Sequence, residues 1–178
     1  MAESFVVADL HLGHEKACIF LDDQGNKTRP WNSVAEMDEA LIEGINAEVR
    51  PHDRLYILGD VAMRCKAMSA LYRAHGKKVL VKGNHDTFEL REYLKYFEDI
   101  RAAVVKGRFV LTHIPVHAGS LDRWRGNVHG HLHSKRVLLP DGKPDPRYLC
   151  VSVEQTGFRP IPLDEAFGHI TRALSSIG

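Results

Sequence analysis

The sequence predicts an α/β fold, and three observations support this prediction. Short apolar runs alternate with helical patterns along the chain, and each run ends in a polar or glycine-containing turn. Hydrophobic residues make up 44% of the 178 residues and charged residues 26%, as is usual in globular proteins with a buried core. We therefore expect a single domain over residues 1–178.

The expected strands are apolar runs rich in β-branched residues. The first of them leads into Asp9, and the second leads into Gly59 and Asp60. Such short, continuous apolar runs bounded by turn residues are typical of buried strands. Strands are predicted over residues 5–8, 55–58, 78–82, 108–111 and 148–153, and a further short strand leads from Val128 into the segment 129–133.

The clearest helical pattern covers residues 33–49. Ser33 and Glu36 form a capping box at its start, apolar residues recur at helical spacing, and Pro51 follows its end. Further helices are predicted over residues 67–74, 87–97 and 163–174.

Charge and composition exclude several classes of protein. The net charge of +1 gives no global field that attracts nucleic acid, and a local basic patch of Arg123, Arg125, Lys135 and Arg136 stays open as an alternative. Three widely spaced cysteines indicate neither a disulfide framework nor a zinc ribbon. The sequence has no apolar stretch of about 20 residues and no signal-peptide pattern at its start, so we expect a cytoplasmic protein that does not interact with membranes.

Five polar fragments follow the apolar runs, where ligands of open α/β sheets usually bind. They are Asp9-Leu10-His11, Gly59-Asp60, Gly83-Asn84-His85-Asp86, Thr112-His113 and Gly130-His131-Leu132-His133. A mixed set of nitrogen and oxygen donors without thiolate suits Mn, Fe, Zn, Co or Ni better than Mg or Ca. If the segment 129–133 is extended, its spacing of two places His131 and His133 on one face. We interpret His129 as a structural residue.

The order of these fragments resembles the calcineurin-like metallophosphoesterases, over roughly residues 5–133. Arg29-Pro30-Trp31 and the start of the following helix are similar to small bacterial and phage members of that superfamily. The resemblance implies a four-layer α/β/β/α sandwich, in which two mixed β-sheets are flanked by helices. It also implies two metal ions, of which Mn is the preferred identity and Fe, Zn, Co or Ni are alternatives.

The resemblance implies a role for each matching residue. The metal ligands would be Asp9, His11, Asp60 and His133 for the first ion, and Asp60, Asn84, His113 and His131 for the second. Asp60 would bridge the two ions, and a bridging hydroxide would attack phosphorus in line. His85 would stabilise the transition state and protonate the leaving oxygen, so the expected catalytic residues are His85, Asp60 and Asn84.

Three further residues are candidate substrate contacts: Arg64, His14 and His117. Each also has an ordinary structural interpretation, respectively as a solvated arginine at a helix start, a helix cap and a rim residue. Protein phosphatases of this superfamily carry an acid and a glycine where this chain has Met63 and Cys65, which disfavours a serine/threonine phosphatase. Whether Asp86 replaces that acid as the partner of His85 stays open at this stage.

The spacing of the third and fourth motifs bears on the substrate. Only 27 residues separate His85 from His113, which leaves no room for a cap domain and predicts an open site. We therefore predict a metal-dependent phosphodiesterase that acts on a phosphoester substrate, such as a nucleotide or nucleic acid. The alternatives are a DNA or RNA nuclease, a phosphomonoesterase and, in a different class, a metal-free binding scaffold like the retromer subunit of this fold. Near-neutral charge argues against the nuclease, and the unsubstituted ligand set argues against the scaffold.

Overall fold

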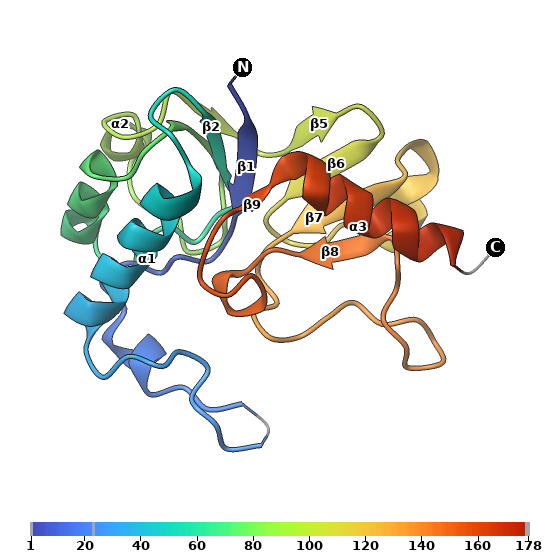
Figure 1. The fold of residues 1–178 in the computed structure, drawn as a ribbon, viewed down its shortest axis with the longest axis horizontal. Coiled ribbons are helices and arrows are strands. Elements are labelled where there is room, and N and C mark those ends of the chain that lie inside the picture. The colour runs from blue at the N-terminus through green and yellow to red at the C-terminus, as the bar shows by residue number, and fades with distance from the viewer. Residues whose placement is uncertain (1, 23, 177–178) are drawn as a thin grey trace.

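The computed structural model describes residues 2–22 and 24–176 and shows two β-sheets (Figure 1). The first sheet has the strand order β4-β3-β2-β1-β9, and only β9 runs antiparallel to its neighbour. Its strands are β1 (Ser4–Val7), β2 (Arg54–Ile57), β3 (Lys77–Val81), β4 (Asp99–Arg101) and β9 (Ile161–Pro162).

The second sheet has the order β5-β6-β7-β8, with β5 antiparallel to β6 and the other neighbours parallel. Its strands are β5 (Val104–Lys106), β6 (Phe109–Thr112), β7 (Gly126–His129) and β8 (Tyr148–Cys150). The helices are α1 (Val34–Glu48), α2 (Leu90–Tyr93) and α3 (Leu163–Ser175), with 3₁₀ helices η1 (Glu15–Cys18), η2 (Cys65–Tyr72), η3 (Ala118–Arg123) and η4 (Val153–Gln155). Two mixed sheets flanked by helices confirm the predicted fold class.

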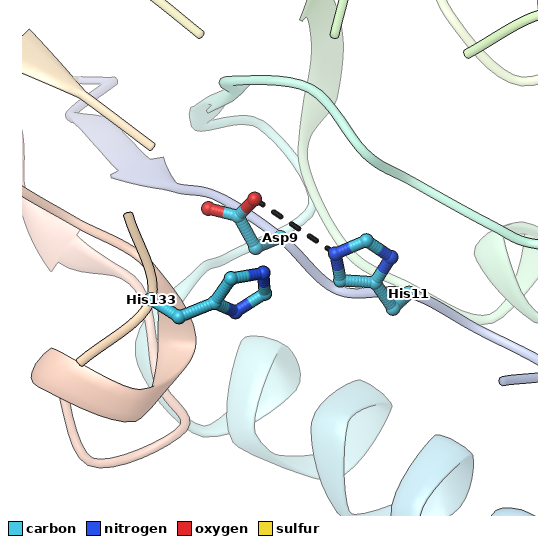
Figure 2. Close-up of side chains that lie close together, drawn as sticks. All are labelled: Asp9, His11 and His133. Atoms are coloured by element: carbon cyan, nitrogen blue, oxygen red, sulfur yellow. Dashed lines mark ion pairs between the residues drawn. The ribbon is translucent and has the colours of Figure 1, made fainter. Parts of the chain in front are cut away.

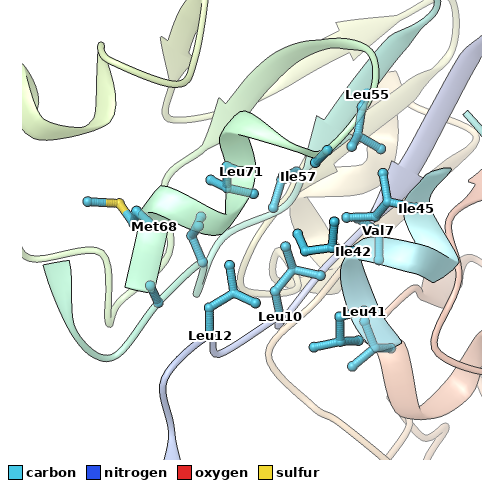
Figure 3. Packing of buried hydrophobic residues seen from close by; sticks show 14 of the residues in the cluster. Val7, Leu10, Leu12, Leu41, Ile42, Ile45, Leu55, Ile57, Met68 and Leu71 are labelled. Atoms are coloured by element: carbon cyan, nitrogen blue, oxygen red, sulfur yellow. The ribbon is translucent and has the colours of Figure 1, made fainter. Parts of the chain in front are cut away.

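The first sheet is buried on both faces, which explains its continuous apolar strands. Side chains alternate along a strand, so Leu55 and Ile57 of β2 point toward α1 and η2, whereas Tyr56 and Leu58 point toward the second sheet. The core on the helix side includes Ile42 of α1 and is shown in Figure 3. Burial on both sides fixes the register of the strands and therefore the positions of the residues at their ends.

Helix α3 lies across the second sheet (Figure 1). Phe167 stacks on Phe109 of β6 with ring centroids 4.2 Å apart, and Ile170 packs where Gly126 of β7 has no side chain. Leu163, Ala166 and Ile170 belong to the apolar cluster between the sheets. The terminal helix therefore contributes three buried side chains to this apolar cluster.

Several predicted boundaries were wrong. The predicted helix 87–97 is α-helical only over Leu90–Tyr93, because Asp86 and its neighbours form the turn after β3 and Glu89 is still extended. The predicted helix 67–74 is the 3₁₀ helix Cys65–Tyr72. The predicted strand 148–153 ends at Cys150, because the chain then bridges from Ser152 to Ala8 and turns into η4. The sequence analysis missed β4, β5 and β9, which are only two or three residues long.

Candidate metal centre

The ends of five strands from both sheets meet in one region. Asp9 and His11 follow β1, Asp60 follows β2, Asn84 and His85 follow β3, His113 follows β6, and His131 and His133 follow β7. The structure therefore brings together residues from all five predicted motifs.

The first group of possible metal ligands consists of Asp9, His11 and His133. One ligand atom from each lies within 4.8 Å of the others. Figure 2 shows the three side chains, with His11 Nε2 3.9 Å from Asp9 Oδ1. The His11 and His133 rings stack with centroids 5.2 Å apart. A nitrogen and oxygen set of this kind suits a transition metal.

The second group consists of Asp60, His113 and His131, whose ligand atoms also lie within 4.8 Å of one another. His113 Nε2 is 2.8 Å from the amide oxygen of Asn84, which places Asn84 beside this group. The His113 and His131 rings meet edge to face at 5.1 Å.

Asp60 lies between the two groups. Its Oδ2 is 3.6 Å from His11 Nε2, and its Oδ1 is 3.4 Å from His113 Nε2. Each oxygen of this one carboxylate therefore faces a different group. This is the arrangement expected of a carboxylate shared by two cations.

Buried polar atoms in the first group lack partners. Asp9 Oδ1 and both ring nitrogens of His11 are buried and have no hydrogen-bond partner among the described residues. Leaving such atoms unpaired costs about 1–3 kcal/mol each. Metal coordination would satisfy Asp9 Oδ1 and one nitrogen of His11, so the residues fit a metal ion.

Hydrogen bonds orient two of the histidines. His113 Nδ1 donates to the carbonyl of Leu58 at 2.8 Å, and His133 Nδ1 donates to Glu154 Oε1 at 3.1 Å. Each bond places a proton on Nδ1, so Nε2 is the nitrogen that remains to bind a metal. Such bonds are the usual way in which proteins fix the tautomer of a metal-binding histidine.

The pKa shifts of His11 and Asp60 suit cation binding, whereas burial raises the pKa of Asp9, and hydrogen bonds to Asp60 and Glu154 outweigh burial and raise the pKa of His113 and of His133. Burial lowers the pKa of His11 to about 3, so this imidazole is neutral at pH 7. Burial alone would raise the pKa of Asp60, but hydrogen bonds from His113 and from the His85 backbone hold it at about 2. Burial likewise opposes ionisation of Glu154, but its bond to His133 and the nearby Arg29 keep its pKa at about 2. Neutral imidazole and ionised carboxylate are the forms that bind metals.

The backbone at the centre is strained. Six non-glycine residues in the described part of the chain have positive φ, and five of them are predicted ligands: Asp9, His11, Asp60, His131 and His133, with φ between 50° and 70°. This conformation costs of order 1–3 kcal/mol per residue and is concentrated at functional sites. The prediction of an extended segment 129–133 was therefore wrong beyond His129, where β7 ends.

Glycines allow the loops to approach one another closely. A Cβ on Gly83 would overlap Asp60 Oδ1, and a Cβ on Gly130 would lie 2.6 Å from Asp9 Oδ2. Gly59 has a φ of +81° and packs against His113. Any side chain at these positions would push a candidate ligand out of place.

An ionic network that the sequence analysis did not assign to the site supports the first group. Arg29 is 1% exposed and donates to the backbone carbonyls of Asp9 at 2.6 Å and Leu10 at 2.8 Å. Its Nε also donates to Glu154 Oε1 at 2.8 Å, the same oxygen that accepts from His133. Because arginine is usually exposed, the sequence carries no local signal of this burial.

Asp86 bonds to the backbone of two loops and not to the imidazole of His85. Its carboxylate accepts hydrogen bonds from the backbone N–H groups of Asp60, Val61 and Gly83 at 2.8–3.0 Å. It therefore ties the loop after β2 to the loop after β3. His85 is exposed, and its ring lies 5.7 Å from that of His11.

The three candidate substrate contacts differ in position. The His14 ring lies 5.8 Å from the His11 ring, beside the first group. Arg64 forms an exposed ion pair with Glu15 at 2.8 Å, and His117 accepts a hydrogen bond from Gly119 at the start of η3. His129 is buried outside both groups and bonds to the carbonyl of Gly130.

No family model matches the chain. The uncharacterised protein MJ1445 of Methanocaldococcus jannaschii is 29% identical over 170 residues, which cover 92% of this chain and 89% of that protein. Among solved structures, the protein of unknown function AQ665 from Aquifex aeolicus has a TM-score of 0.67 and 22% identity, over 94% of this chain and 99% of that one. An archaeal phosphodiesterase has a TM-score of 0.47 and 17% identity, over 84% of this chain and 82% of that one.

Across residues 2–22 and 24–176, no helix has the length and apolar character needed to cross a membrane. The likeness to the Aquifex protein shows a shared fold over nearly the whole of both chains. Two mixed sheets flanked by helices, with candidate ligands at the strand ends, agree with the α/β architecture predicted from the sequence.

Proposed function

We propose that this chain hydrolyses phosphoesters with two metal ions and prefers diesters to monoesters. The observation that carries the proposal is the position of Asp60, whose two oxygens face two separate groups of possible ligands. Asp9, His11 and His133 would hold one ion, and Asn84, His113 and His131 would hold the other, with Asp60 shared. The two cations would supply Lewis-acid stabilisation of the charge that develops on the phosphoryl group.

His85 is the proposed general acid. Its backbone N–H donates to Asp60 Oδ1 at 2.9 Å, which fixes the start of the side chain at the shared carboxylate. Its imidazole is exposed beside His11, where it can give a proton to the leaving oxygen of a bound ester. The amide oxygen of Asn84 lies next to His113, which belongs to the second ligand group, whereas the His85 ring lies beside the first.

The exposure of the loop after β3 supports the preference for diesters. Asn84 and His85 are both exposed, and Pro115 and Val116 after β6 are only partly buried. A substituent on either side of the phosphate can therefore extend into solvent. Mn is the proposed metal, because the ligand set combines imidazole nitrogens with carboxylate and amide oxygens.

Metal removal and reloading test this function. Purified protein should contain about two transition-metal ions per chain, as the two ligand groups require. It should lose hydrolysis of bis(p-nitrophenyl) phosphate after chelation and regain it with added Mn²⁺. Elemental analysis and the rate of p-nitrophenol release are the measurements. Protein that binds no Mn, Fe, Zn, Co or Ni and stays inactive when they are added would be a scaffold and not an enzyme.

The same assay separates the candidate substrates. Bis(p-nitrophenyl) phosphate should be hydrolysed faster than p-nitrophenyl phosphate. Single-stranded DNA should be a poor substrate, because the net charge of +1 provides little attraction for a polyanion. Faster hydrolysis of the monoester or of DNA would replace the proposed diester specificity with one of the alternatives.

Replacement of His85 by alanine tests the general acid. The variant should keep both metal ions, because His85 is not among the proposed ligands. Its kcat should fall roughly 100-fold or more for diesters with alkoxide leaving groups, and much less for p-nitrophenolate, which leaves without a proton. Equal losses for both kinds of substrate would show that His85 acts in another way.

A further inference from the structure

The hairpin between η1 and α1 exposes three consecutive apolar side chains. Ile19 is 67% exposed, Phe20 48% and Leu21 61%. We name these three residues the apolar rim. Single exposed apolar residues are normal on a protein surface, whereas three in succession call for an explanation.

Backbone contacts join the apolar rim to the returning side of its hairpin. The Thr28 N–H donates to the Phe20 carbonyl at 2.9 Å, and Leu21 pairs with Lys27 in an antiparallel bridge. One end follows Cys18, which is buried. The other end is Arg29, which is buried and bonded to the backbone of Asp9 and Leu10. Both ends are therefore fixed, and one of them is fixed directly to the first ligand group.

A row of rings connects the apolar rim to the proposed catalytic residues. Phe20 meets His14 edge to face, with centroids 5.5 Å apart and an angle of 71° between the planes. His14 lies 5.8 Å from His11, and His11 lies 5.7 Å from His85. A leaving group that accepts its proton from His85 can therefore extend past His14 onto Phe20.

We propose that His14 and Phe20 of the apolar rim form a subsite for a flat aromatic ring on the leaving group of the substrate. This inference rests on the proposed function, because it takes the phosphate to lie between the two ligand groups. Edge-to-face and stacked contacts with aromatic side chains favour any flat ring over an alkyl group. Such contacts tolerate different rings, so a nucleobase and a simple aryl group are the two sources of the same chemistry.

Binding of two phosphonates tests the subsite without turnover. Phenylphosphonate and methylphosphonate share a head group and differ by the ring, and neither is hydrolysed. With the full chain in the presence of Mn²⁺, titration calorimetry should show about fivefold tighter binding of phenylphosphonate. In Phe20→Ala this preference should fall to less than about twofold, because the ring contact is lost.

Tyr72→Ala is the matched control. Tyr72, the last residue of η2, is also an exposed aromatic residue, at 69%, but its ring packs on that of Tyr96. The phenyl preference should be unchanged in this variant.

Thymidine 5′-phosphate and deoxyribose 5-phosphate, compared in the same way, would distinguish a nucleobase from an aryl group.

The outcomes separate the two proposals. Equal affinity of the wild type for both phosphonates, or an equal preference in wild type and Phe20→Ala, would overturn the subsite. If bis(p-nitrophenyl) phosphate is still hydrolysed in that case, the proposed function stands. A Phe20-dependent phenyl preference in a protein that hydrolyses no ester would support the subsite and overturn the proposed function.

Discussion

Replacement of Asp60 by alanine should abolish phosphodiester hydrolysis and reduce the metal content of both ligand groups. The reason is the position of this carboxylate, which offers one oxygen to the group of His11 and the other to the group of His113. The variant would lose a ligand from each ion together with the charge that offsets them. We expect kcat/KM to fall by roughly three orders of magnitude or more, of the size that the loss of a central catalytic electrostatic group produces. Enzyme assays and elemental analysis of the dialysed variant measure the two effects.

Asp53→Asn is the matched control for this experiment. Asp53 lies just before β2, whereas Asp60 lies after the same strand, and both carboxylates are almost fully buried. Asp53 accepts hydrogen bonds from the backbone of Glu3 and Arg50. It therefore lies at the end of β2 that is away from the ligand groups. Its replacement should lower the unfolding temperature and leave the metal content unchanged. Two tightly bound ions in Asp60→Ala would contradict the bridging role.

Replacement of Arg29 by methionine should have the largest effect on stability. Arg29 and Glu154 form an ion pair whose side chains are only 2% and 6% exposed. Removal of the guanidinium would leave the Glu154 carboxylate buried with only His133 as a partner, and two backbone carbonyls would lose their donor. Breaking a buried pair on one side costs about 3–5 kcal/mol. Urea unfolding of the metal-free protein, followed by circular dichroism, measures this loss.

Two further variants test the explanation. Arg73 forms a pair with Glu39 whose side chains are about half exposed, at 54% and 49%, so Arg73→Met should lower the stability far less than Arg29→Met. The double variant Arg29→Met with Glu154→Gln should be more stable than Arg29→Met alone, because no unpaired charge is then buried. A double variant that is no more stable would show that the loss comes from packing and not from the uncompensated carboxylate.

The sequence predicts where the candidate metal centre lies in the fold, but it predicts the geometry of that centre less well. Apolar runs that end at Asp9, Asp60 and His113 are enough to place these residues at strand ends, because strand burial and turn chemistry are local properties. The left-handed backbone of His131 and His133 is not a local property. It is imposed by contacts between distant segments, including the bond from the His131 N–H to Asp9 Oδ2 at 2.9 Å.

The same limit applies to the residues that support the ligands. Arg29 and Glu154 lie 125 positions apart, and neither is typical of a buried residue by type. Adjacency in sequence suggests Asp86 as a partner of His85. The structure shows that its carboxylate faces the backbone of the neighbouring loop, which adjacency could not reveal.

The contacts that complete the first ligand group join the two ends of the chain. Ser152 donates to Asp9 Oδ2 at 2.6 Å across 143 positions, and the pair of Arg29 and Glu154 spans nearly as many. During synthesis the N-terminal ligands leave the ribosome long before their C-terminal partners exist. Contacts of such high sequence separation form late and slow the folding of a domain. Metal binding by the first group is therefore a property of the finished chain, and we expect nascent chains that end before Ser152 to lack it.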